Sequence, residues 1–233
     1  KDGFDWETIE PDNPWSYIGY WGDHQIIYLL KFFEFIEDYY PGTLKQYFKQ
    51  EIFVYANVPY TIKEYKEILK DPKNTIDFDH EGEEAIEYRM AAIGADGALL
   101  LNERTEVHKV NFLEKILATV LAKVSNLIPE GGIWMNTQRP EWNDANNALV
   151  GNGVSMVTLY YLRRFLSFFE EVLQQESDEV RVSAELALFF RGISQALENN
   201  KDFLSTGFTD VQRKVVLDAL GEPASEYRWK IYK

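Results

Sequence analysis

The stretch DHQIIYLLKFFEFIEDYY, from Asp23 to Tyr40, decides the fold class of this chain. Its apolar residues cover more than one face of a helix, which is typical of a helix that is buried on most sides. Asp23 is a suitable N-cap residue, and Pro41 and Gly42 end the pattern. We therefore predict a long core helix here, preceded by an irregular, aromatic-rich segment over residues 1–22.

The rest of the chain repeats this helical character. Apolar periodicity and capping residues predict helices over residues 43–50, 62–69, 79–93, 107–128, 154–173 and 178–198, and one from Thr209 to about residue 221. A small hairpin over residues 95–104, a long loop over residues 129–153 and an extended tail complete the prediction. No linker divides the chain. We expect one all-α domain over residues 1–233, with two concentric helical layers and at most one small hairpin.

The composition excludes several classes of function. The chain has 233 residues, no cysteine, 24 basic and 38 acidic residues, and a formal charge of −14. Without cysteine there is no disulfide, thiolate nucleophile or cysteine-bound metal. The negative charge disfavours nucleic acid and anionic membranes as partners, and no apolar run is long enough to span a bilayer. The compartment and the oligomeric state stay open, with a slight preference for the cytoplasm.

The segment RPEWNDANN, residues 139–147, has the richest chemistry in the chain. It combines carboxylates, side-chain amides and an indole ring within a loop between helices. Sugar sites need this mixture, because amides and carboxylates bond vicinal hydroxyls and an indole stacks on a pyranose. A carboxylic acid with a raised pKa can also protonate a glycosidic oxygen. The alternative interpretation is an Asn- and Asp-rich turn that caps helices.

A second segment, WSYIGYWGDHQ over residues 15–25, surrounds a polar triplet with aromatic residues. Asp23 and His24 could hydrogen-bond a ligand there. Alternatively, Asp23 is an N-cap and the aromatic residues cover the core. This segment and residues 139–147 each precede a very apolar helix. If the two helices are parallel neighbours, both segments open at the same end of the domain.

A third cluster offers hard oxygen ligands and a histidine for a divalent cation: Asp77, Asp79, His80, Glu81, Glu83 and Glu84. It has neither EF-hand nor HExxH spacing. The acidic start of a helix explains the same residues, so we expect no metal site.

The order of the motifs points to a known family. An aromatic loop leads into Gly22-Asp23-His24-Gln25, and the sequence continues through Asn57-Val58-Pro59-Tyr60, Glu141-Trp142-Asn143-Asp144-Ala145-Asn146-Asn147 and Gly151-Asn152-Gly153-Val154-Ser155. This order resembles the catalytic α/α-toroid domain of the cellobiose and chitobiose phosphorylases, a branch of the six-hairpin glycosidases. In that family, a Ser-Asp-Asp-Leu helix start binds the non-reducing sugar, and an Asp-Trp-Asn-Asp-Gly-Met-Asn loop supplies the general acid. The resemblance spans roughly residues 15–173.

The resemblance implies that Asp144 is the proton donor, that Asp23 is a sugar-binding carboxylate and that Trp142 lies near the scissile bond. The two segments supply further substrate-binding candidates: Trp21, His24, Glu141, Asn143 and Asn147. The chain departs from the family at Glu141, where the family has Asp, at Ala145, where it has Gly, and at His24, where a second Asp is usual. A complete toroid needs more helices than we predict, so we expect a partial toroid, either in a fragment of a larger enzyme or in a reduced relative.

We therefore expect an inverting glycoside phosphorylase or hydrolase that acts on a glucose- or N-acetylglucosamine-type glycoside. Asp144 would protonate the leaving oxygen while phosphate or water attacks the opposite face, with no metal or organic cofactor. A hydrolase would need a second carboxylate about 6.5–9.5 Å from the acid, and Glu141 is a poor candidate because it lies too close in sequence. The alternative is a non-catalytic carbohydrate-binding or helical scaffold domain derived from that fold.

Overall fold

The computed structural model describes residues 22–136, 151–174 and 179–232. Helices dominate this part of the chain, so the expected all-α class is confirmed. None of the described helices is both long enough and apolar enough to cross a membrane.

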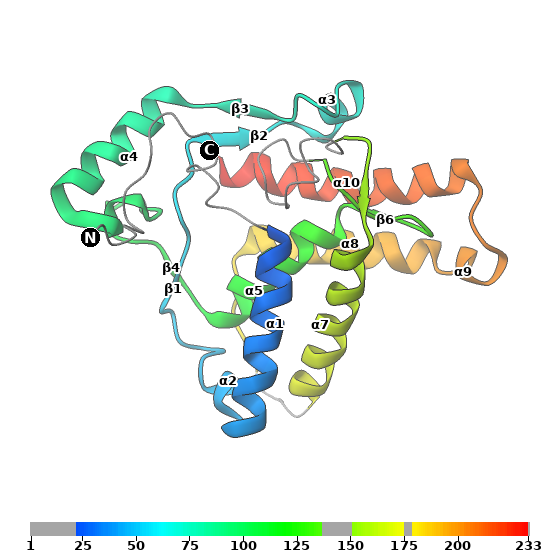
Figure 1. Cartoon of the computed structure of the whole chain (residues 1–233), viewed down its shortest axis with the longest axis horizontal. Coiled ribbons are helices and arrows are strands. Elements are labelled where there is room, and N and C mark those ends of the chain that lie inside the picture. Colours follow the sequence, from blue (N-terminus) through cyan, green and yellow to red (C-terminus); the bar gives the residue numbers. More distant parts are fainter. Residues whose placement is uncertain (1–21, 137–150, 175–178, 233) are drawn as a thin grey trace, which may run out of the picture.

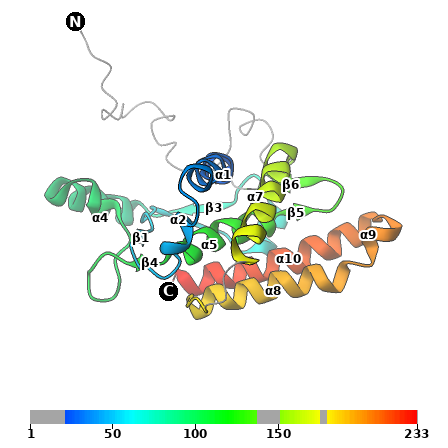
Figure 2. The same ribbon diagram turned by 90° about the horizontal axis from the view of Figure 1, so that it is seen from below.

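Three long helices pack around a shared core, with α5 behind the pair α1 and α7 (Figures 1 and 2). They are α1 (Gly22–Tyr39), α5 (Phe112–Val124) and α7 (Met156–Gln174). Their shared core is aromatic: the Phe33 ring makes edge contacts with Phe112 at 5.2 Å and Phe169 at 5.7 Å between ring centroids. Such T-shaped pairs add attraction beyond the apolar area that they bury. The long helices predicted at residues 23–40 and 154–173 are therefore present, but the expectation that such apolar helices are buried on most sides is wrong, because each buries one face and exposes large apolar side chains such as Phe32 and Tyr160 on the other.

Behind these helices, α8 (Ala184–Asn200) and α10 (Asp210–Ile231) form a helical hairpin that runs across them (Figures 1 and 2). The short helix α9 (Phe203–Thr206) lies in their connection. The hairpin packs closely, because the Pro223 ring lies where Gly192 has no side chain and Phe189 stacks on Tyr227 at 5.0 Å.

The prediction that the last helix ends near residues 220–221, followed by an extended tail, is wrong. The helix α10 continues through Pro223 to Ile231. Gly221 is not a helix end but a packing residue, since a Cβ there would lie 2.4 Å from the Tyr65 ring. The packing of Gly221 and Pro223 against neighbouring elements offsets the hydrogen bond that proline removes from a helix.

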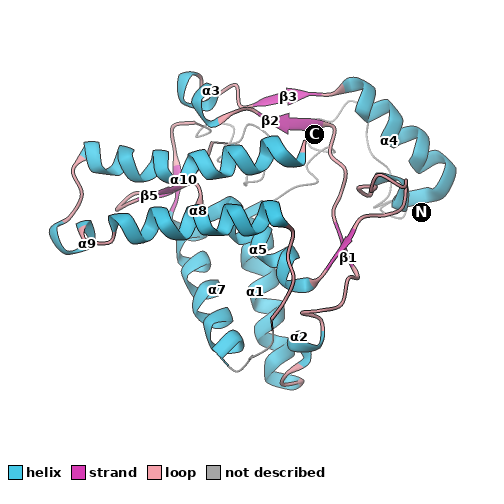
Figure 3. Ribbon diagram, turned by 180° about the vertical axis from the view of Figure 1, so that it is seen from behind, coloured by secondary structure: helices cyan, strands magenta, loops and turns pink. Residues whose placement is uncertain are grey.

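The expectation of at most one small hairpin is also wrong. The described residues contain three small antiparallel sheets (Figure 3). Strand β1 (Phe53–Val54) pairs with β4 (Lys109–Val110), β2 (Tyr60–Ile62) pairs with β3 (Ile76–Phe78), and β6 (Gly132–Trp134) pairs with β5 (Leu127–Ile128) and β7 (Val154–Ser155). Strands of two or three residues are too short to show an alternating apolar pattern, which explains why the sequence did not predict them.

The smaller helices are close to their predicted places. They are α2 (Thr43–Gln46), α3 (Tyr65–Lys70) and α4 (His80–Ile93), followed by the 3₁₀-helix η2 (Gly94–Ala98) in place of the predicted hairpin turn. Helix α5 begins later than predicted, because Asn111 caps it and the residues before it pair with β1.

Candidate functional site

The helices α1 and α7 lie side by side and run in the same direction (Figure 1). Lys31 Nζ lies 5.7 Å from the centre of the Tyr161 ring, and Arg164 donates to Glu34 at 2.8 and 2.6 Å. Since contacts advance along both helices in the same order, the two helices are parallel. The helices that follow residues 15–25 and 139–147 are therefore parallel neighbours.

The register of this pair places the start of α1 beside the start of α7. Glu34 and Arg164 are 130 residues apart, and the Lys31–Tyr161 contact has the same offset. The same offset makes Ile26 level with Met156, the first residue of α7, so α1 begins about one helical turn before α7. Packed helix axes lie about 8–10 Å apart, so the two helix starts face one end of the molecule together.

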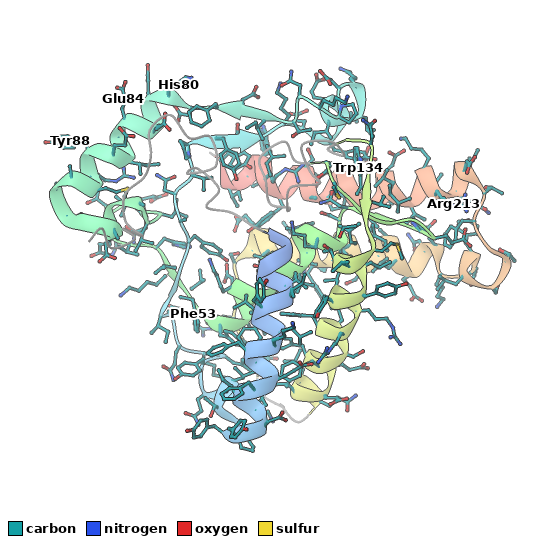
Figure 4. The ribbon with its side chains drawn as sticks, in the orientation of Figure 1. Phe53, His80, Glu84, Tyr88, Trp134 and Arg213 are labelled. Atoms are coloured by element: carbon teal, nitrogen blue, oxygen red, sulfur yellow. The ribbon has the colours of Figure 1, made fainter. Side chains whose placement is uncertain are left out.

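At this end of the molecule, hydrogen bonds join the end of β6 to the residues just before β7. After β6, Met135 N–H donates to Gly153 O at 3.0 Å, and Gly151 N–H donates to Met135 O at 2.7 Å. The Trp134 indole N–H donates to Gly151 O at 3.1 Å (Figure 4). The described residues on either side of residues 137–150 therefore lie next to each other, directly before α7.

The returning strand is fixed by close packing. Gly151 has φ +80°, and a Cβ on it would lie 2.5 Å from Pro72 O. Trp134 is buried in a small cluster with Tyr65 and Ile68. Ser155 Oγ then accepts a hydrogen bond from Thr158 N–H at 3.1 Å, which satisfies a free donor in the first turn of α7.

The candidate residues themselves are placed only in part. Asp23 and His24 lie in the first turn of α1, and the structure describes their backbone but not their side chains. The other candidates lie outside the described residues: Trp21, Glu141, Trp142, Asn143, Asp144 and Asn147. What the structure brings together is therefore the start of α1 and the two anchors of the loop that carries Asp144.

The cluster proposed as an alternative metal site behaves as a helix start. Asp79 Oδ1 accepts a hydrogen bond from Gly82 N–H at 2.9 Å and caps α4. His80 Nδ1 lies 3.8 Å from Glu83 Oε2, and the histidine is exposed. Within residues 22–136, 151–174 and 179–232, no three potential ligands gather around one point.

A partly buried lysine was missed by the sequence analysis. Lys115 Nζ donates to Val54 O at 2.7 Å and lies 4.0 Å from the centre of the Tyr55 ring. Burial lowers the pKa of Lys115 to about 8. Burial, with Glu114 as the next cause, raises the pKa of Tyr227 to about 12. Nothing in the helix sequence distinguishes Lys115 from an ordinary surface lysine, and its bond to a carbonyl gives it a structural role.

Three surface grooves among the described residues lie elsewhere. One is apolar and lies between α5, α7 and α8, with Leu127, Leu162 and Leu197 in its walls. Another lies between the start of α3 and the end of α10, beside Trp229. A third lies between α1 and α7 near Asp38. None of the residues that line them is a candidate from the sequence analysis.

Comparisons with known proteins leave the family open, because no family model matches the chain and no curated protein matches it.

Proposed function

We propose that this chain is a carbohydrate-active domain of the inverting glycoside phosphorylase or hydrolase type. Its substrate is a glucose- or N-acetylglucosamine-type glycoside. The observation that carries the proposal is the parallel register of α1 and α7, which sets the starts of the two helices about one turn apart at the same end of the described structure. As part of the proposal, we assign the segment with Asp23 and His24 and the segment with Asp144 to this one end of the domain.

The anchoring of the loop supports this assignment. Hydrogen bonds of Met135 and Trp134 to residues 151 and 153 hold together the described residues that flank residues 137–150. Fixed ends reduce the entropy that is lost when a loop orders around a ligand. Carboxylates, amides and an indole on such a loop suit a polyhydroxylated substrate.

The proposed mechanism is a single displacement at the anomeric carbon. Asp144 donates a proton to the leaving oxygen, while phosphate or a water molecule attacks from the opposite face. Inversion follows because one displacement occurs. Asp23 binds hydroxyl groups of the non-reducing sugar, and Trp142 stacks near the scissile bond. For hydrolysis, a second carboxylate about 6.5–9.5 Å from the acid would activate the water.

The finer fold assignment, a partial α/α toroid, belongs to the same proposal. Neighbouring inner helices of a toroid run parallel, as α1 and α7 do, and α5 runs the other way beside them. Phe112 at the start of α5 contacts Phe169, whereas Val124 at its end shares a groove with Leu159. The alternation of directions supports a partial toroid.

The experiment is an assay of sugar release from gluco- and N-acetylglucosamine-based disaccharides, with and without phosphate. Phosphate-dependent formation of a sugar 1-phosphate identifies a phosphorylase, and phosphate-independent release identifies a hydrolase. Asp144→Asn should reduce turnover by at least about a hundredfold, because general acid catalysis contributes about that much. Asp202→Asn is the matched control, since Asp202 is exposed before α9 and its side chain makes no capping bond.

The same assay separates the alternative function. If the chain binds a disaccharide, releases no sugar and keeps its affinity in Asp144→Asn, it is a carbohydrate-binding domain. If it neither binds nor cleaves any member of a broad panel, the carbohydrate proposal fails and a helical scaffold remains.

A further inference from the structure

Helix α1 presents a row of aromatic side chains to solvent. Tyr28, Phe32, Phe35 and Tyr39 are between 55% and 67% exposed. Their spacing of four, three and four residues places them on one face of the helix. A contiguous apolar patch of this kind is uncommon on the surface of a monomer and marks an interaction site. We call these four residues the aromatic row.

The aromatic row lies opposite the core side of α1. Ile26, Leu30 and Phe33 face inward and are buried. In Figure 2, α1 and α7 form the outer layer on one side, and the α8–α10 hairpin lies on the other side. Within the described structure, Phe32, Phe35 and Tyr39 of the aromatic row keep more than half of their surface exposed.

We propose that a second copy of this chain covers the aromatic row, with the two α1 helices packed antiparallel about a two-fold axis. An axis midway between Phe32 and Phe35 places each of these residues opposite the other in the second copy. The same axis places Tyr28 opposite Tyr39. The row is therefore self-complementary, as an isologous interface requires.

Charge favours this arrangement. Lys31 and Asp38 lie on the side of α1 that faces α7, since Lys31 contacts Tyr161 and Asp38 lines a groove with Arg164. In an antiparallel two-fold pair, the sides of the two α1 helices that face α7 lie next to each other, along the same edge of the interface. Measured along the helix axis, Lys31 then lies about 3 Å from the level of Asp38 of the second copy. In a parallel pair, this side would face the opposite side of the second helix and the contact would be lost.

The available area is sufficient for a weak, specific dimer. An aromatic side chain buries about 150–250 Å², so four side chains exposed by a little over half offer about 500 Å² per copy. Two copies bury about 1,000 Å² through these rings alone, which is near the lower limit for a specific interface.

The test is sedimentation equilibrium of the full chain over a wide concentration range at physiological salt. We expect a reversible monomer–dimer equilibrium. Phe32→Glu and Phe35→Glu should each weaken the dimer at least about tenfold, since each places a charge in an apolar contact. Tyr88→Glu on α4 is the matched control, because Tyr88 is equally aromatic, highly exposed and on a different helix (Figure 4). Circular dichroism should report the same helical content in all variants.

Charge reversal tests the antiparallel arrangement separately. Lys31→Asp and Asp38→Lys should each weaken the dimer severalfold, and the double variant should restore it by exchanging the two charges. A chain that stays monomeric at every concentration overturns the proposal. So does a dimer that Phe32→Glu leaves unchanged, and a double reversal without recovery overturns the antiparallel pairing. A monomer that loses stability in Phe32→Glu would instead indicate that the row is covered within the chain, which also overturns the proposal.

Discussion

Arg164 of α7 holds the carboxylate of Glu34 of α1 with two hydrogen bonds, of 2.8 and 2.6 Å. This bidentate pair joins residues 130 positions apart and sets the parallel register of the two helices. Planar guanidinium–carboxylate pairs are geometrically specific as well as charge-assisted. The pair therefore links a local side-chain contact to the end of the domain where we place the functional site.

A double-mutant cycle should measure this link. We expect Glu34→Ala and Arg164→Ala each to lower the free energy of unfolding by about 0.5–1.5 kcal/mol, with a coupling of about 0.5 kcal/mol, because the Arg164 side chain is more than half exposed. Urea unfolding provides the values. The pair Glu67–Lys70 is the control, since it is an exposed pair within one helix and should show smaller coupling. Additive single effects would mean that apolar packing alone sets the register.

The anchor of the loop before α7 can be tested at Gly151. An alanine there requires a positive φ and brings its Cβ to 2.5 Å from Pro72 O. Gly42→Ala is the matched control, because Gly42 has φ +81° and nothing lies near its Cβ position. We expect Gly42→Ala to cost about 1 kcal/mol of unfolding free energy and Gly151→Ala about 2–4 kcal/mol, since the clash involves backbone. Equal losses in urea unfolding would show that the contact with Pro72 relaxes without cost.

A buried cap offers a third test. Asn111 Oδ1 accepts from Glu114 N–H at 2.9 Å, and its Nδ2 donates to Arg181 O at 2.6 Å. Asn111→Ala should lower the free energy of unfolding by about 2–3 kcal/mol, because it removes a buried cap and the hydrogen bond that Asn111 donates to the Arg181 carbonyl. The exposed cap Asp79 is the control, and Asp79→Ala should cost about 1 kcal/mol. A smaller loss for Asn111→Ala than for Asp79→Ala would contradict this account.

The long helices were predictable because their cores are periodic. The expected helix over residues 23–40 is α1 (Gly22–Tyr39), and the one over residues 154–173 is α7 (Met156–Gln174). The end of α10 was not predictable, because a glycine followed by a proline is also the usual pattern at the end of a helix. Only the tertiary contacts of Gly221 with Tyr65 and of Pro223 with Gly192 explain why the helix continues.

The candidate site was predictable as a set of segments but not as a geometry. Composition singled out residues 15–25 and 139–147. Whether they meet depends on the direction and register of α1 and α7, which no local pattern determines. The same limit applies to Lys115, whose unusual environment comes from Val54 and Tyr55, more than fifty residues earlier in the chain.

The lowered pKa of Lys115 predicts a rise in stability at alkaline pH. The side chain titrates at about 8 in the folded state, against 10.5 for an unperturbed lysine. Between these values the unfolded chain binds more protons, so the free energy of unfolding increases with pH from about 8 to 10. The pKa difference corresponds to at most about 3 kcal/mol, and we expect about 1–2 kcal/mol because the side chain is only partly buried. Above pH 10 the trend reverses, since burial raises the pKa of Tyr55, Tyr65 and Tyr227 and the folded state then holds the extra protons.

Urea unfolding of the wild type and of Lys115→Met between pH 7 and 10 checks this prediction. The variant removes the titrating amine and should lose the rise, leaving only the fall towards pH 10 that the raised pKa values of Tyr55, Tyr65 and Tyr227 cause. Lys109→Met is the control, because Lys109 is exposed in β4 and should leave the wild-type slope unchanged. If the free energy of unfolding of Lys115→Met still rose with pH, another group would be the source of the rise. The hydrogen bond from Lys115 Nζ to Val54 O would then be keeping the amine protonated despite its burial.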